Sequence, residues 1–221
     1  MIDVELHSHT HHSIDSLNRI ADIVRTCANV GIDRIAITDH NEIDGALRAH
    51  ALAPDLVIVG EEVKTSAGEL LCLFISKRIP RGMSPEDTIA QVHAQGGIVG
   101  APHPLDPIRS GLGRTNLIRL APMLDFIEVY NARTIDPARN AEADVLAREL
   151  GLPRTVGSDA HLLRELGGCR VRMRPYSSPQ DFLVALSDAT LITHASSPLM
   201  RVGSRWAAFA HHIGVDKNHT D

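Results

Sequence analysis

Six short apolar runs in this sequence each lead into side chains of the kinds that bind metal ions. Residues two apart on a strand share a face, so His-x-His and Asp-x-His at a strand end place both side chains together. If the strands are parallel, their C-terminal ends meet at one rim, where barrel enzymes build their active sites. We therefore expect all six ends to converge: IDVEL leads into His7 and His9, IAIT into Asp39 and His40, VIVG into Glu61 and Glu62, IVGAP into His103, FIEVY into Asn131, and TVG into Asp159 and His161.

Segments of helix length separate most of these runs. A Ser-Pro-Glu start and a glycine stop mark a helix over 84–97, and further strands are expected at 69–75 and 190–195. The stretch after His103 is predicted as a loop. Repeated strand-then-helix order predicts an α/β protein whose parallel strands are covered by helices; the other expected helices are 17–31, 43–52, 136–151 and 178–188.

No linker interrupts the series before about residue 195, so a single domain over 1–195 is predicted. The remaining segment, 196–221, is predicted to be a tail with a short amphipathic helix around Trp206 and a frayed end. The sequence leaves the oligomeric state open.

Composition limits the kinds of molecule that the protein is expected to bind and the cellular compartment in which it is expected. The net charge is −5, the 22 basic residues are scattered, and aromatic residues make up 3%, which disfavours an extended nucleic-acid footprint. The end of an oligonucleotide, or a nucleotide, remains a candidate ligand. No apolar run reaches the length of a membrane span, and the N-terminus lacks the pattern of a secretion signal, so no membrane association and a cytoplasmic location are expected.

The expected ligands are imidazoles and carboxylates. One His-x-His pair alone would more simply be two hydrogen-bonded surface histidines, but six strand ends of this kind favour a shared metal site. The three cysteines are widely spaced and suggest no thiolate site. Nitrogen and oxygen ligands suit Mn, Zn or Fe, and the ligands do not choose among these metals.

Six motifs resemble those of the PHP superfamily, named for polymerase and histidinol phosphatase, and this chain resembles its small stand-alone members. The resemblance covers about residues 1–195 and implies a distorted (β/α)7 barrel, similar to a TIM barrel, with the active site at the C-terminal ends of the strands. It also implies two or three divalent metal ions and phosphoester hydrolysis. The motifs, in order, are HSHTHHSIDS, ITDHN, GEEV, APHP, EVYN and GSDAH.

The resemblance also implies a ligand set, with Glu62 bridging two ions. Glu61 is a rival for that role, although the family pattern favours Glu62. Several family members have His at the place of Asn131, and many have Asp where this chain has Glu5, whose longer side chain could still orient His7. Asp39 is a similar supporting candidate, although it could equally cap the turn after its strand. The implied ligands are His7, His9, Glu62 and Asp159 for the first metal, Glu62, His103 and Asn131 for the second, and Asp15, His40 and His161 for the third.

The expected reaction is hydrolysis of a phosphomonoester or nucleotide by a hydroxide that bridges two metals. Catalytic contributions are expected from Asp159, His161 and His103. Three alternatives stay open: an exonuclease acting on oligonucleotide ends, an amidohydrolase, and a non-catalytic module stabilised by metal. For phosphate recognition we expect one of three arginines to matter, each of which could equally be a surface residue: Arg109, Arg114 and Arg133.

Overall fold

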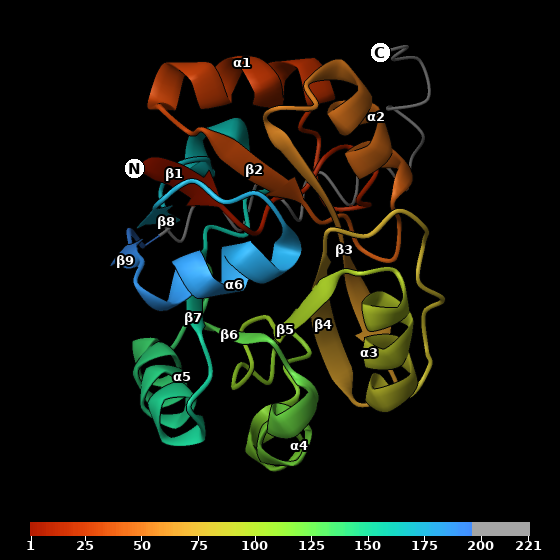
Figure 1. Ribbon diagram of the computed structural model, residues 1–221, viewed down its shortest axis with the longest axis vertical. Helices are drawn as coiled ribbons and strands as arrows, with labels where there is room; N and C mark the ends of the chain where they lie inside the picture. The colour runs from red at the N-terminus through yellow and green to blue at the C-terminus, as the bar shows by residue number, and fades with distance from the viewer. Residues whose placement is uncertain (196–221) are drawn as a thin grey trace.

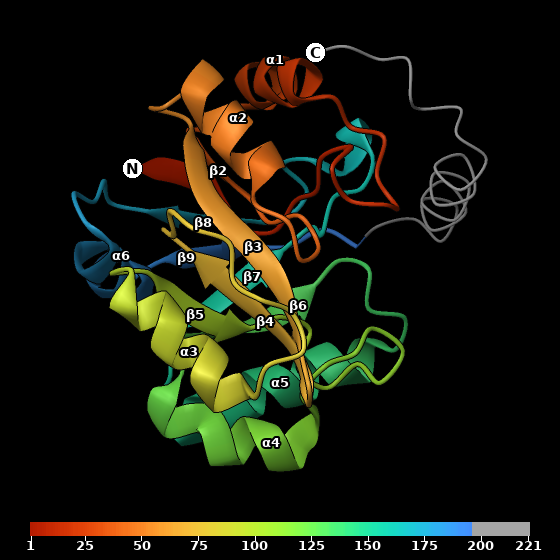
Figure 2. The same ribbon diagram turned by 90° about the vertical axis from the view of Figure 1, so that its right-hand side faces the viewer.

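The computed structural model describes residues 1–195, and the predicted tail lies outside the described residues. Figure 1 and, turned by 90°, Figure 2 show helices packed around a strongly curved sheet. Its strands are β1 (Ile2–Glu5), β2 (Arg34–Ile37), β3 (Val57–Thr65), β4 (Gly68–Leu73), β5 (Ile98–Ala101), β6 (Phe126–Asn131), β7 (Arg154–Gly157), β8 (Arg170–Met173) and β9 (Thr190–Ile192). The helices are α1 (Ile20–Val30), α2 (Asp44–Leu52), α3 (Pro85–Ala94), α4 (Gly113–Leu120), α5 (Pro137–Leu150) and α6 (Pro179–Ser187), with short 3-10 turns at Ala121–Met123 and Leu163–Glu165.

The sheet is a nearly closed barrel. Its strand order is β7-β6-β5-β4-β3-β2-β1-β8-β9, and the residues just beyond β1 and β7 also meet, through a parallel bridge between Ser8 and Ala160. The His9 amide donates to the Ala160 carbonyl at 2.9 Å. This bridge brings the first and seventh strands together at their C-terminal ends, so the predicted α/β barrel is confirmed.

Strand directions distort the barrel. The pairs β1–β2, β2–β3, β5–β6 and β6–β7 are parallel, whereas β4 is antiparallel to both β3 and β5. The expectation that all strands are parallel is therefore wrong for β4. A two-residue turn joins β3 to β4, and so short a connection can only make a hairpin.

Local sequence explains where several helices begin and end. Ser84, Asp136 and Ser178 each precede a proline and accept a hydrogen bond from the backbone of the first turn of α3, α5 and α6. Gly31 and Gly151 end α1 and α5 in the left-handed conformation that glycine adopts at little cost. The starts and stops predicted for these helices agree with the structure to within a few residues.

Two elements were not predicted. Helix α4 begins at a glycine without a side-chain cap, in the stretch that was expected to be a loop. Strand β8 has only four residues and pairs antiparallel with β1 and β9 outside the ring. Within residues 1–195, no helix is long and apolar enough to cross a membrane.

The packing between β5 and β6 leaves no room at Gly100. This residue pairs with Phe126, and a Cβ atom at position 100 would lie 2.2 Å from the Phe126 ring. Phe126 is fully buried, so its ring has little space to move. The absence of a side chain at position 100 is therefore a packing requirement.

We predict that Gly100→Ala lowers the free energy of unfolding by about 1–3 kcal/mol because it overpacks the core. Urea denaturation measures the change. Combining it with Phe126→Leu should make the added cost of the alanine smaller than in the wild-type background. An equal cost in both backgrounds would show that the ring is not the obstacle.

Candidate metal centre

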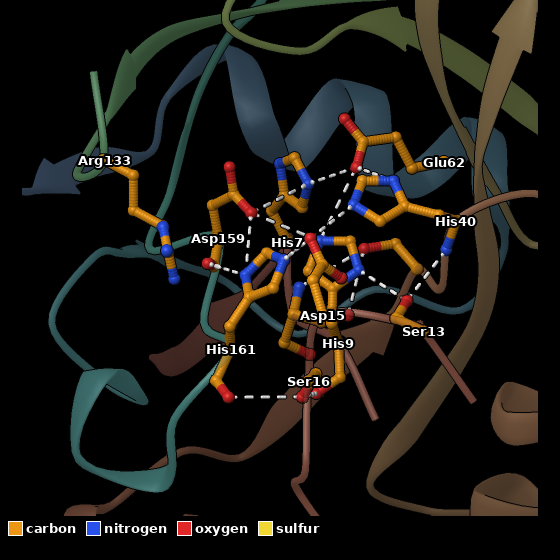
Figure 3. Close-up of polar contacts among 12 residues, drawn as sticks. His7, His9, Ser13, Asp15, Ser16, His40, Glu62, Arg133, Asp159 and His161 are labelled. Carbon is orange, nitrogen blue, oxygen red and sulfur yellow. Dashed lines mark hydrogen bonds and ion pairs between the residues drawn. The ribbon is translucent and has the colours of Figure 1, made fainter. Parts of the chain in front are cut away.

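The C-terminal ends of the barrel strands carry a compact cluster of imidazoles and carboxylates, shown in Figure 3. His7 and His9 follow β1, His40 follows β2, and His103 follows β5. Glu62 and Asn131 lie within β3 and β6, and Asp159 and His161 follow β7. Most of these side chains are buried, while His40 and Asp15 are partly exposed. The structure thus brings together side chains from all six predicted strand ends.

The Glu62 carboxylate lies at the centre of this cluster. Its Oε2 atom is 3.2 Å from His7 Nε2 and 3.0 Å from His40 Nδ1, and its Oε1 atom is 2.9 Å from His103 Nε2. Glu61 points the other way, since its carboxylate accepts a hydrogen bond from the Ile79 amide. Of the two rival carboxylates, Glu62 is therefore the one that faces the cluster.

Three groups of potential ligands overlap within the cluster. In each group the ligand atoms lie within 4.8 Å of one another: His7, His9 and Asp159; His7, Glu62 and His103; and His9, His40 and His161. Asp15 extends the last group, with its Oδ2 atom 3.0 Å from His161 Nε2 and 3.6 Å from His40 Nε2. The groups overlap with the three ligand sets that the family resemblance implies, but His7 stands in place of Asn131 in the second group and His9 joins His40 and His161 in the third. Asp159 and His161 belong to different groups.

Two atoms at the centre show that the cluster suits metal ions. His9 Nε2 and Asp159 Oδ1 are buried, and neither has a hydrogen-bond partner among the described residues, although they lie 3.2 Å apart. Buried polar atoms are rarely left in this state. A divalent ion bound by imidazole nitrogen and carboxylate oxygen would satisfy both atoms.

Electrostatics keep the acids ionised. Burial alone would raise the pKa values of Glu62 and Asp159, but the imidazoles around Glu62 and the Arg109 guanidinium and His7 beside Asp159 hold both pKa values well below their usual range. Burial, with His161 and His40 nearby, lowers the pKa of His9 to about 3. Ionised carboxylates and a neutral imidazole are the forms that bind metals.

His7 and His40 behave in the opposite way. Burial disfavours their charged forms, but nearby carboxylates outweigh it: Asp159, Glu62 and Glu128 raise the pKa of His7 well above its ordinary value, and Glu62 and Asp15 do the same for His40. In the protein without metal these two imidazoles hold protons that a metal ion must displace.

The backbone is unfavourable at two cluster residues. Asp159 has φ = 54° and His103 has φ = 29°, in the region that residues with a side chain rarely occupy. Such conformations persist only where surrounding contacts enforce them, and they gather at functional sites. At both positions the side chain points into the cluster.

Asn131 lies in the cluster as a hydrogen-bond donor. Its Nδ2 atom donates to Glu128 Oε2 at 2.9 Å and to Asp159 Oδ2 at 3.0 Å, while its Oδ1 atom accepts from the Arg133 amide at 2.9 Å. The amide oxygen, the atom that would bind a metal, thus faces the backbone. Metal ligation by Asn131 stays a prediction.

Of the three candidate arginines, Arg109 reaches the cluster. Its guanidinium pairs with Asp159 Oδ2. Arg133 is buried and pairs with Glu165 at 3.1 Å, and Arg114 makes an exposed ion pair with Glu142 on α5 at 3.2 Å. Arg109 is therefore the arginine best placed to meet a bound anion.

Sequence analysis missed Glu128 and Glu69. Glu128 Oε1 lies 2.9 Å from His7 Nδ1, a contact that had been expected for Glu5. Glu5 instead accepts hydrogen bonds from the amides of Ser158 and Gly167, and burial raises its pKa to about 7. Glu69 on β4 lies 3.9 Å from His103 Nε2, and burial, with Glu62 nearby, raises its pKa to about 7.

Asp39 supports the cluster from the loop side. Its carboxylate accepts hydrogen bonds from the Thr10 amide at 2.7 Å and from Ser13 Oγ at 3.0 Å, and Ser13 Oγ also accepts from the His40 amide. These bonds join the loop after β1 to the end of β2. Asp39 thus has the supporting place expected for it, without itself belonging to a ligand group.

Comparison with known proteins identifies the family of this chain. A PHP domain model matches residues 5–149 and a PHP-associated model matches 137–191, so this chain belongs to the PHP family. The uncharacterized protein MJ1587 of Methanocaldococcus jannaschii is 38% identical over 141 residues, which cover 58% of this chain and 81% of that protein.

Two solved structures share the fold. A two-domain protein from Bacteroides vulgatus that contains a predicted PHP-like metal-dependent phosphoesterase superposes with a TM-score of 0.72 at 18% identity, covering 87% of this chain and 65% of that one. The lesion-specific endonuclease PfuEndoQ from Pyrococcus furiosus superposes with a TM-score of 0.61 at 16% identity, covering 86% of this chain and 57% of that one. At these identities the likeness shows the fold alone.

We predict that divalent metal binds more tightly as the pH rises from about 6 to 8, because the raised pKa values of His7 and His40 keep both imidazoles protonated above their ordinary range. Calorimetric Mn titrations in buffers of different ionisation enthalpy measure both the affinity and the protons released. An affinity independent of pH, without proton release, would contradict this assignment of the ligands.

Proposed function

We propose that this protein is a metal-dependent phosphoesterase that hydrolyses a phosphomonoester or nucleotide. The observation that carries the proposal is the sharing of ligands between neighbouring groups: Glu62 contacts imidazoles of all three groups, and His7 and His9 each belong to two. Overlapping groups suit a cluster of two or three ions such as Mn, Zn or Fe better than separate sites.

The balance of charge favours a phosphate substrate. Bound divalent ions would supply positive charge for the phosphate and lower the pKa of a coordinated water. The three carboxylates among the predicted ligands, Asp15, Glu62 and Asp159, only partly offset the charge of three such ions, which leaves about +3. A site of that charge stabilises a phosphate dianion better than a neutral amide.

Arg109 adds a hydrogen-bond donor of defined direction to the positive charge that the metal ions would supply. Its side chain is 19% exposed and pairs with Asp159, a predicted ligand. A guanidinium can bind two phosphate oxygens with parallel hydrogen bonds. Because Asp159 would share its charge with a metal ion in the loaded protein, we infer that Arg109 turns part of its donor capacity to the substrate phosphate.

The orientation of His161 limits its part in proton transfer. Its Nδ1 atom lies 2.8 Å from the Asp159 carbonyl, which can only accept, so this nitrogen carries the hydrogen. Nε2 is then left to face Asp15 and the third ligand group. We therefore assign His161 mainly to metal binding, and leave proton transfer to Asp159 or His103 as the remaining candidates.

Reconstitution of metal-depleted protein with Mn tests the proposal. We predict turnover of a nitrophenyl monoester or a nucleoside monophosphate, with loss of more than 100-fold in Asp159→Ala because a ligand is lost. Phosphate or nitrophenolate release measures the rate, and a diester and a 5′-phosphorylated oligonucleotide are run in parallel. Cleavage of the oligonucleotide, and of neither the monoester nor the diester, would contradict this proposal and favour an exonuclease.

Two other results would also contradict the proposed phosphoesterase. Hydrolysis of amides but not of phosphoesters would favour the amidohydrolase. Full metal loading without turnover of any substrate would favour the non-catalytic module. Either result would overturn the proposed reaction.

We predict that Arg109→Met raises the KM for a monoester by about 10-fold or more, because a charge-assisted hydrogen bond contributes about 1.5–3 kcal/mol. Steady-state kinetics with the Mn-loaded variant measures the change. Arg148→Met is the matched control, since Arg148 forms an exposed pair with Asp144 on α5. Equal KM values in the two variants would remove Arg109 from substrate binding.

A further inference from the structure

Glu128 is a buried carboxylate that joins two of the ligand groups without belonging to either. Its Oε1 atom lies 2.9 Å from His7 Nδ1. Its Oε2 atom accepts hydrogen bonds from the His103 backbone amide at 2.7 Å and from Asn131 Nδ2 at 2.9 Å. One side chain on β6 therefore contacts residues that follow β1 and β5.

Two local features direct Glu128 into the cluster. The pairing of β6 with β7 shifts register between Glu128 and Tyr130, so Glu128 and Asn131, three residues apart, both reach the cluster. Gly157 on β7 leaves space for the carboxylate, because a Cβ atom there would lie 2.0 Å from Glu128 Oε1. The bulge and the glycine together make a place for this acid.

The contact with His7 selects the nitrogen that faces the metal groups. The Glu128 carboxylate oxygens face N–H donors, since Oε2 accepts from two of them and Oε1 is placed to accept from a third, so the hydrogen between the two groups lies on His7 Nδ1. Nε2 is then directed to Glu62 Oε2 at 3.2 Å and Asp159 Oδ1 at 3.7 Å. Since His7 belongs to two ligand groups, its orientation affects both.

The contact with His103 acts through the backbone. His103 has an unfavourable φ of 29°, and the hydrogen bond from its amide to Glu128 helps to hold that conformation. Its imidazole then points to Glu62, with Nε2 at 2.9 Å from Oε1. Without the Glu128 carboxylate, His7 and His103 would each lose a contact that holds their orientation toward Glu62.

A different carboxylate, Glu165, contacts the backbone of the third ligand group, which consists of His9, His40 and His161. Glu165 accepts hydrogen bonds from the backbone amides of His161 and Leu162 at 3.0 Å and also pairs with Arg133. Among the described residues, Glu165 contacts Arg133 and the turn that carries His161, and not His7 or His103. The two carboxylates therefore support different parts of the cluster.

We propose that Glu128 is a positioning residue that sets metal affinity in the two groups containing His7, while Glu165 does so in the group containing His161. This inference rests on the metal-binding part of the proposed function and not on the substrate. Supporting carboxylates of metal-bound histidines typically change affinity by about 10–100-fold.

Metal titration of the full chain tests the inference without any turnover. Glu128→Gln should weaken binding at the two groups with His7 by about 10–100-fold and leave the remaining site near its wild-type affinity. Glu165→Gln should show the reverse pattern. Calorimetry with Zn gives the affinities. ¹⁵N NMR of the Zn-loaded protein reports the hydrogen bond made by His7 Nδ1–H, whose chemical shift should change in Glu128→Gln only.

Glu61→Gln is the matched control, because Glu61 is a buried carboxylate next to Glu62 that binds only the Ile79 amide among the contacts described. Glu128→Asp keeps the charge, shortens the side chain and should give an intermediate loss, which also serves if Glu128→Gln does not fold. Unchanged Zn affinities in these Glu128 variants, or the same losses in Glu61→Gln, would overturn the inference. The metal affinities can be measured even if the protein hydrolyses no phosphoester, so failure of the proposed reaction would not affect this test.

Discussion

The ionised carboxylate of Glu62 is buried between three imidazoles, and the cluster at the C-terminal end of the barrel depends on these contacts. An unpaired carboxylate in such a place would be too costly to remain charged. His7, His40 and His103 lie within 3.2 Å of it and come from the ends of three different strands. The barrel must therefore bring those strand ends together in a fixed arrangement. The nearly closed sheet, with its bridge between Ser8 and Ala160, provides that arrangement.

A layer of further carboxylates fixes the residues around Glu62. Asp39 joins the loop after β1 to the end of β2, Glu128 joins His7 to His103, and Glu165 holds the turn that carries His161. Each acid bonds to backbone amides or to imidazole rather than to solvent. Glycines make room for two of them, since a Cβ atom at Gly45 would lie 2.2 Å from Asp39 and one at Gly157 would lie 2.0 Å from Glu128. The strained backbone at Asp159 and His103 is stable within this layer.

Much of the arrangement can be predicted from the sequence because strand ends and helix caps are local signals. The alternation of apolar runs and capped helices predicts parallel strands covered by helices, and the family resemblance implies that they close into a barrel. The residues after each run predict the cluster. The direction of β4 depends on the length of one turn. Helix α4 lacks a start signal, and β8 has too few residues to show a period. Glu128 could not be placed, because in a regular strand it and Asn131 would face opposite sides, and only the bulge in β6 turns both inward.

Anomalous diffraction from Mn-loaded crystals tests the central claim most directly, because it counts the ions and locates their ligands. The structure predicts two or three ions about 3.5–4 Å apart, with Glu62 shared between two of them and with His9 Nε2 and Asp159 Oδ1 as ligands. A single ion, or ions that leave Glu62 and Asp159 bound only to protein side chains, would contradict the account.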